Sequence, residues 1–245
     1  MPTLEVFAIG AIATFAGYGM FAITAFGAAI VIVPLLSHVM PLADILPVTV
    51  VFDVAAATTL GVRLRADADR RELARLVPFS LVGAVLGVTL LVSLPRVATL
   101  VALGAFLVAY AAWSLAEGGR LRTIGAWWAA VAGLIGGAMG TLFGVGGPPY
   151  VIYLSRRLDD KTRLRATIAV MIALSVVMRL TVFAVAGLMV AERFVLVALW
   201  LPFAAAGFWC GTRVQRRVAR PTVVRLLNAL LLVLGASLLW RALAD

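Results

Sequence analysis

Two charged side chains lie deep inside long apolar segments, and they are the first candidates for chemistry. Arg179 lies in the middle of the apolar run 166–191, and Asp53 lies within the run 46–62. A charge at membrane depth usually faces a cavity, a partner or a permeating ion. Arg179 is therefore a candidate counter-ion for an anionic substrate, and Asp53 is a candidate for proton coupling. A permanent ion pair between them that only fixes helix packing is the alternative.

A glycine–proline break interrupts the uncharged run 124–154 and is the second candidate. The break consists of Gly144, Val145, Gly146, Gly147, Pro148 and Pro149. Glycine lets the backbone turn, and a half-helix that begins near the prolines would present unpaired N–H groups to an anion. Since proline has no N–H group, the expected donors are Val145, Gly146, Gly147 and Tyr150. A glycine hinge kept only for close helix packing is the alternative.

The run 4–36 carries a weaker counterpart of this break. Phe26 and Gly27 are followed by Pro34, and this copy has fewer glycines than the break at 144–149. We expect Phe26 and Gly27 to contribute to the same substrate site from the first half of the chain.

Small polar residues inside the apolar runs are weaker candidates for lining a path. They are Thr58, Thr59, Ser175 and Asn228. Single hydroxyl and amide groups in membrane helices also bond to neighbouring helices, which is the alternative interpretation.

The composition places all these residues in a membrane. Hydrophobic residues make up 64% of the chain, whereas soluble domains contain about 45–50%. The apolar runs are 4–36, 46–62, 73–94, 97–116, 124–154, 166–191, 194–212 and 223–243. The net charge of +10 comes largely from arginine-rich loops, which are typical of cytoplasmic membrane anchors and not of nucleic-acid binding. The single cysteine, Cys210, excludes an internal disulfide and a cysteine metal cluster.

Two of the eight runs, 4–36 and 124–154, are too long for one crossing of a hydrocarbon core about 30 Å thick. Each opens a set of four runs, which predicts structural repeats over residues 1–118 and 119–245. Basic clusters lie at 63–75, 120–122, 156–165 and 213–225. All four fall on one side of the membrane only if the run 124–154 folds back, as the positive-inside tendency favours.

We therefore expect an all-α polytopic membrane protein with about ten helical segments in two inverted repeats. The basic loops are expected in the cytoplasm and both termini in the periplasm. A full double crossing and a re-entrant hairpin both fit the charge pattern of the broken segments, so that choice stays open.

Several features together resemble the TauE/SafE family of membrane transporters. They are the Gly-x-Gly-Gly motif at 144–147, the apolar half-helix after it, the basic loop 156–165 and the Val-Pro-Leu-Leu motif at 33–36. The resemblance covers essentially the whole chain, and it carries the glycine motifs onto Gly144, Gly146, Gly147 and Gly27. It implies secondary transport of small sulfur-containing or organic anions across the bacterial inner membrane. Examples are sulfite, sulfoacetate and other organosulfonates.

The residues and the resemblance favour an alternating-access carrier for a small anion, coupled to a proton or sodium ion. An anion channel would use the same residues and is the alternative. An intramembrane enzyme is not expected, because no paired carboxylates, serine–lysine pair or metal-ligand spacing occurs. We expect no cofactor, metal or nucleic acid, and the sequence leaves the oligomeric state open.

Overall fold

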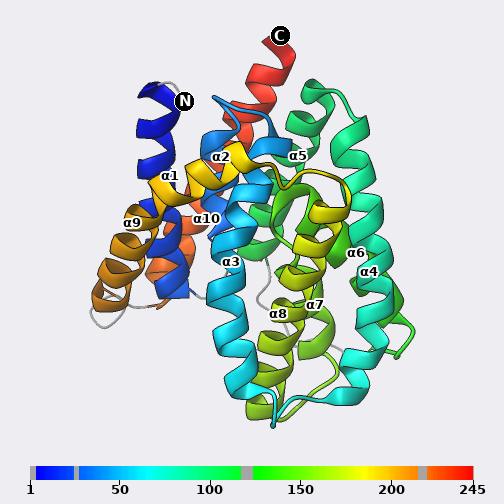
Figure 1. The fold of residues 1–245 in the computed structure, drawn as a ribbon. Helices are drawn as coiled ribbons and strands as arrows, with labels where there is room; N and C mark the ends of the chain where they lie inside the picture. Colours follow the sequence, from blue (N-terminus) through cyan, green and yellow to red (C-terminus); the bar gives the residue numbers. More distant parts are fainter. Residues whose placement is uncertain (1–3, 25–27, 117–123, 215–219, 245) are drawn as a thin grey trace. The chain divides into compact units, whose positions relative to one another are not determined.

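The computed structural model describes residues 4–24, 28–116, 124–214 and 220–244. The described residues form ten helices and no strand (Figure 1). The first five helices are α1 (Leu4–Thr24), α2 (Ala29–Leu36), α3 (Leu42–Leu64), α4 (Arg70–Ser93) and α5 (Arg96–Ala116). The second five are α6 (Trp128–Phe143), α7 (Gly147–Ser155), α8 (Lys161–Val185), α9 (Ala191–Val214) and α10 (Arg220–Ala244).

The chain is an all-α polytopic membrane protein, as its composition predicts. Within the described residues, four helices are long and apolar enough to cross a membrane, namely Leu4–Ile23 in α1, α4, α8 and α9. Their outward faces are apolar, since Val82 and Leu86 of α4 are 51% and 52% exposed. Such side chains suit contact with lipid, where the exposed surface needs no polar groups.

The helices form two compact units, each built from both halves of the sequence. Unit 1 comprises Met1–Ile45, Ser93–Gly119 and Ala191–Asp245, and unit 2 comprises Leu46–Val92 and Arg120–Val190. Unit 1 thus holds α1, α2, α5, α9 and α10, whereas unit 2 holds α4, α6, α7, α8 and most of α3.

Both overlong apolar runs are broken into two helices. The run 124–154 becomes α6 and α7, and the run 4–36 becomes α1 and α2. The 9 residues of α7 span about 14 Å and the 8 residues of α2 about 12 Å, so neither helix can cross the membrane by itself. The run 124–154 also folds back, because the Arg157 guanidinium beyond α7 donates to the Ile124 carbonyl oxygen before α6 at 3.2 Å.

Glycines set the closest helix contacts in each unit. In unit 1, Gly207 and Gly211 of α9 lie against the backbone of Phe15 and Gly19 in α1. In unit 2, Gly83 and Gly87 of α4 lie against the α6 backbone, and Gly133 and Gly137 of α6 lie against the α4 backbone. Small residues let membrane helices approach closely, so that van der Waals contact holds them together where no hydrophobic effect operates.

Filling the α4–α6 contact should destabilise unit 2. A Cβ atom at Gly137 would collide with the Ser80 carbonyl oxygen, whereas one at Gly147 would meet no atom within 4 Å. We expect Gly137→Ala to lower the free energy of unfolding by about 1–3 kcal/mol, the usual cost of overpacking. Gly147→Ala is the matched control and should unfold like the wild type. Thermal unfolding of the purified protein in detergent measures both, and equal midpoints for the two variants would contradict this packing.

Candidate functional site

The glycine–proline break forms a sharp turn between α6 and α7 in unit 2. Gly144 ends α6 in the left-handed region with φ 75°, and its N–H donates to the Gly140 carbonyl oxygen at 3.0 Å. Two prolines fill the first turn of α7, where their missing N–H groups cost no helical hydrogen bond. Gly146 lies against the backbone of Gly140, which leaves no room for a side chain there. The turn therefore needs glycine at both Gly144 and Gly146.

The N-terminal end of α7 borders open space. No atom lies within 4 Å of the place where a Gly147 side chain would begin, and Gly147 is partly exposed. The first-turn amides of a helix have no partner within that helix, and the helix dipole adds positive potential there. This end of α7 is therefore suited to an anion.

Arg179 of α8 reaches the break and binds its backbone. Its side chain is only 4% exposed, and one terminal nitrogen donates to the Gly140 carbonyl oxygen at 3.1 Å. The other terminal nitrogen donates to the Asp53 carboxylate of α3 at 2.5 Å. The Nε atom is buried and has no hydrogen-bond partner among the described residues. Arg179 thus holds the break and the acid together and keeps one donor unused.

Three hydroxyl groups lie beside this arrangement. The Tyr150 hydroxyl of α7 is 3.5 Å from the Ser175 hydroxyl of α8, and the Ser80 side chain of α4 lies beside it as well. Ser175 and Arg179 are four residues apart on α8 and share one face of that helix. Ser80 is buried, and its hydroxyl has no partner in hydrogen-bond geometry among the described residues. The hydroxyls add neutral hydrogen-bonding groups next to the charged pair.

The structure brings together most of the candidates named from the sequence. Asp53 and Arg179 are paired, and the pair adjoins the turn at 144–149 and the hydroxyl of Ser175. Asn228 is buried in α10, which is part of unit 1. Phe26 and Gly27 lie outside the described residues, and so do the side chains of Thr58 and Thr59.

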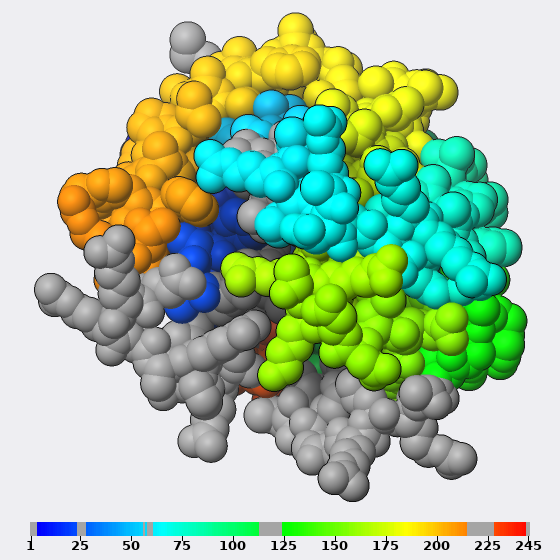
Figure 2. Space-filling model, turned by 90° about the horizontal axis from the view of Figure 1, so that it is seen from below, coloured from blue at the N-terminus to red at the C-terminus, as the bar shows by residue number. Residues whose placement is uncertain are grey.

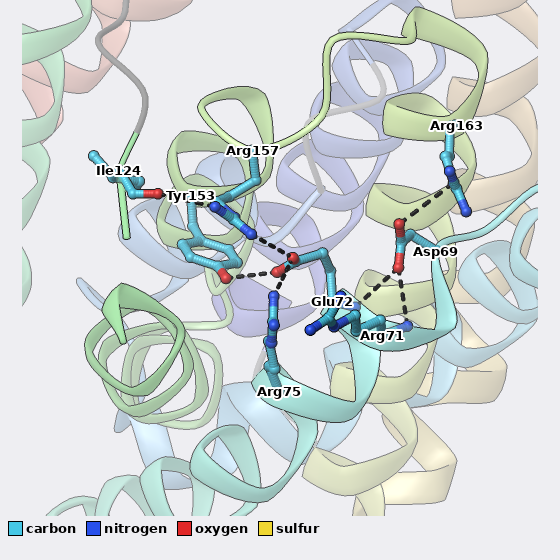
Figure 3. Close-up of polar contacts among 8 residues, drawn as sticks. All are labelled: Asp69, Arg71, Glu72, Arg75, Ile124, Tyr153, Arg157 and Arg163. Atoms are coloured by element: carbon cyan, nitrogen blue, oxygen red, sulfur yellow. Dashed lines mark hydrogen bonds and ion pairs between the residues drawn. The ribbon is translucent and has the colours of Figure 1, made fainter. Parts of the chain in front are cut away.

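Sequence analysis missed a second ionic cluster, which lies at the other end of α7. Glu72, in the first turn of α4, is 4% exposed and accepts hydrogen bonds from Arg75, Tyr153 and Arg157 (Figure 3). The bond to Glu72 raises the pKa of the Arg157 guanidinium above its ordinary value. From the sequence, Glu72 resembles an exposed acid at a helix start. The only sign in the sequence that Glu72 forms ion pairs is that Arg70, Arg71 and Arg75 flank it.

The start of α4 and the connection from α7 to α8 lie side by side. Figure 2 shows this face, with the α4 start in cyan beside the connection in yellow-green. Asp69 pairs with Arg163 at 3.4 Å, and the Asp69 N–H donates to the Thr167 hydroxyl at 2.9 Å. The basic clusters 63–75 and 156–165 therefore meet at one end of unit 2.

Unit 1 holds its own half-helix in a related way. The C-terminal end of α2 receives hydrogen bonds from Arg96 of α5 to the Ser37 carbonyl oxygen and from Arg241 of α10 to the His38 carbonyl oxygen. Arg193 of α9 pairs with Asp44 at 2.5 Å. Cations at a helix C-terminus stabilise its unpaired carbonyl groups and its dipole.

Comparison with known proteins decides the family. The model of the sulfite exporter TauE/SafE family matches residues 8–238, which is nearly the whole chain. The chain belongs to the TauE/SafE family. A relative in Comamonas testosteroni, described as "Probable inner membrane transporter protein TsaS", is 28% identical over 177 residues. That match covers 70% of this chain and 74% of the relative. No solved structure matches the chain.

TauE/SafE proteins are membrane transporters, so this chain is a transporter of that family. A transporter of small molecules needs a binding site at membrane depth, and non-helical backbone is usually tolerated there only beside protein or a wet cavity. The break between α6 and α7 is non-helical backbone that packs against protein, since Gly146 lies against Gly136 and Gly140 of α6. Among the described residues, no group of three or more histidine, cysteine or acidic side chains could hold a metal ion.

The Asp53–Arg179 pair should behave as a buried ion pair in stability measurements. Removing one partner by Asp53→Asn or Arg179→Gln should cost about 3–5 kcal/mol, because the other charge stays buried. The double variant Asp53→Leu/Arg179→Met should recover most of that loss, since two apolar side chains leave no charge uncompensated. Thermal unfolding in detergent compares the three variants. Additive losses in the double variant would show that the two residues are not coupled.

Proposed function

We propose that this TauE/SafE protein is a secondary transporter of a small anion, most directly sulfite or an organosulfonate, across the bacterial inner membrane. The observation that carries the proposal is the buried Arg179 guanidinium bound to the Gly140 carbonyl at the break. It places an unused donor, the Nε atom, in the same part of unit 2 as the amides at the start of α7. The family's description as sulfite exporters supports a sulfur-containing substrate, and the description of the TsaS relative supports transport across the inner membrane.

The anion would be held by Arg179 and by the amides of Gly146 and Gly147. The Val145 N–H, also expected as a donor, donates to the Met139 carbonyl oxygen at 3.4 Å instead, and the Tyr150 N–H belongs to the first hydrogen-bonded turn of α7. Charged hydrogen bonds of this kind are stronger than neutral ones, and a low-dielectric site strengthens them further. Backbone amides recognise the oxygen atoms shared by sulfite and sulfonates. The partly exposed Gly147 side would leave space for the rest of an organosulfonate.

Charge balance supports coupling through Asp53. The Asp53–Arg179 pair is neutral, so a bound monoanion leaves one uncompensated negative charge inside the membrane. A substrate that competes with Asp53 for Arg179 releases the carboxylate, which then takes up a proton or a sodium ion. The coupling ion moves with the anion and keeps the site neutral, which avoids a large energetic cost.

We propose alternating access by two inverted repeats, residues 1–118 and 119–245. Each half of the chain contributes five helices, and each opens with a long helix followed by a half-helix. The packing inside the units supports this relation, because glycines join α1 to α9 in unit 1 and α6 to α4 in unit 2. The two pairs occupy equivalent places if α6 is the second copy of α1 and α9 the second copy of α4. Each unit would then contain parts of both repeats.

A flux assay in proteoliposomes tests the site. Wild-type protein should carry sulfite or a sulfonate with saturable, gradient-driven kinetics. Gly146→Leu and the charge-neutral Asp53→Leu/Arg179→Met variant should each lose at least about tenfold in flux, the usual effect of losing a hydrogen bond to a charged group. Arg193→Gln is the control, since it breaks an ion pair within unit 1, whereas the break belongs to unit 2. Unchanged flux in the first two variants would refute the site, and non-saturating conductance would favour a channel.

Thiol labelling tests the proposed orientation. Single cysteines replacing Arg70, Arg163 and Arg217 in a Cys210→Ser background should all react only with a reagent that reaches the cytoplasmic side. Arg241→Cys, near the C-terminus, should react from the periplasmic side. If Arg70 and Arg163 positions label from opposite sides, the inverted-repeat topology is wrong.

A further inference from the structure

Glu72 is a buried carboxylate that the proposed transport site does not use. It lies in the first turn of α4, is 4% exposed, and binds three donors (Figure 3). One carboxylate oxygen accepts from Arg75 at 2.5 Å and from Arg157 at 3.1 Å, while the other accepts from the Tyr153 hydroxyl at 2.5 Å. Burying a carboxylate is expensive, and this set of donors offsets that cost.

The three donors come from two different places in unit 2. Arg75 belongs to α4 itself, one turn beyond Glu72. Tyr153 lies in the last turn of α7, and Arg157 lies two residues beyond the end of that helix. Arg157 also holds the Ile124 carbonyl oxygen in front of α6. Glu72 therefore joins the start of α4 to the end of α7 and, through Arg157, to the start of the broken segment.

The same end of α4 is joined to α8. Asp69 accepts hydrogen bonds from the N–H groups of Arg71 and Glu72, so it caps α4. Its other carboxylate oxygen pairs with Arg163, and its own N–H donates to the Thr167 hydroxyl of α8. The start of α4 thus fixes α7 and α8, the two helices that bring Tyr150 and Arg179 to the break.

The α7 helix is short enough to transmit a displacement from one end to the other. Tyr153 lies six residues after Gly147, a rise of about 9 Å along one continuous helix. At the start of α7 no side chain caps the helix, and open space lies beside Gly147. Gly146 packs against Gly136 and Gly140 of α6, so the contacts at the opposite end complete the set that fixes where the first turn of α7 lies.

We infer that Glu72 is a positioning residue that sets where the first-turn amides of α7 stand relative to Arg179. It does so through Tyr153 and Arg157. This inference rests on the proposed function, in which those amides hold the anion. Removing the Glu72 contacts lets α7 shift along or about its axis, and the anion then loses the simultaneous contact with Arg179 and the amides.

The test compares Glu72→Gln and Tyr153→Phe with Arg75→Gln. Glu72→Gln keeps the side-chain size but removes the charge, and Tyr153→Phe removes only one hydroxyl. Arg75→Gln is the matched control, because Arg75 binds the same Glu72 oxygen as Arg157 but does so from within α4 itself. Each change is made in a Gly147→Cys, Cys210→Ser background. A thiol at Gly147 is sterically tolerated, since nothing lies within 4 Å of its first side-chain atom.

The first readout is the rate at which a small thiol reagent labels the cysteine at position 147. Glu72→Gln and Tyr153→Phe should change that rate between about 2-fold and 30-fold, the range expected for a coupled structural network. Arg75→Gln should leave it within about 2-fold. The second readout is sulfite transport with Gly147 intact, where the two variants should raise KM more than they lower the maximal rate.

The outcomes separate this inference from the proposed function. If the labelling rates of Glu72→Gln and Tyr153→Phe equal that of Arg75→Gln, Glu72 does not position α7 and the inference is overturned. If all three variants lower the maximal rate equally and leave KM unchanged, Glu72 is only structural and the inference is again overturned. If the wild type carries neither sulfite nor a sulfonate, the proposed function fails, while the labelling comparison still decides the role of Glu72.

Discussion

A helix that ends inside a membrane must find partners for its backbone groups within the protein, and the structure depends on how this chain meets that constraint. The α6 helix ends at Gly144, and the Gly140 carbonyl oxygen accepts from both the Gly144 N–H and Arg179. Arg179 is itself neutralised by Asp53. Hydrogen bonds therefore join the break, the arginine and the acid into one arrangement, in which removing a single charge leaves the other uncompensated.

Charge and small size have separate places in this fold. Glycines occupy the helix contacts of α1 with α9 and of α4 with α6, where close approach provides the attraction. Ionic contacts gather at the ends of the two half-helices, with Glu72 at α7 and Arg96 and Arg241 at α2. Each half-helix is thus held by its C-terminal end. The opposite end of α7, where an anion is proposed to bind, has open space beside Gly147.

Local patterns in the sequence predicted much of the fold. Run lengths and the break at 144–149 predicted that two long runs would split, because a helix longer than the membrane must turn, and glycine and proline mark the place. The pairing of Asp53 with Arg179 was foreseeable, since these two charges lie in apolar runs and each needs a partner. Function at the level of the family followed from the glycine motif and the overall length.

Other features depend on contacts that no local pattern encodes. Glu72 lies among arginines at a helix start, and only the fold brings Tyr153 and Arg157, both more than 80 residues away, against it. The composition of the two units could not be predicted either. The apolar runs predicted two sets of helices, but they did not indicate which helices would pack together. Ser80 had no signal at all, since a single serine in an apolar helix usually bonds within its own helix.

The position of a bound anion tests most directly whether the substrate binds between Arg179 and the start of α7. Crystals of the wild-type protein grown with a selenium oxyanion in place of sulfite would locate it by anomalous scattering. The account predicts one strong peak within hydrogen-bond distance of Arg179 and of the Gly146 or Gly147 amide. A selenium peak elsewhere in the membrane region, with the Arg179–Asp53 pair undisturbed and nothing bound at the start of α7, would contradict it.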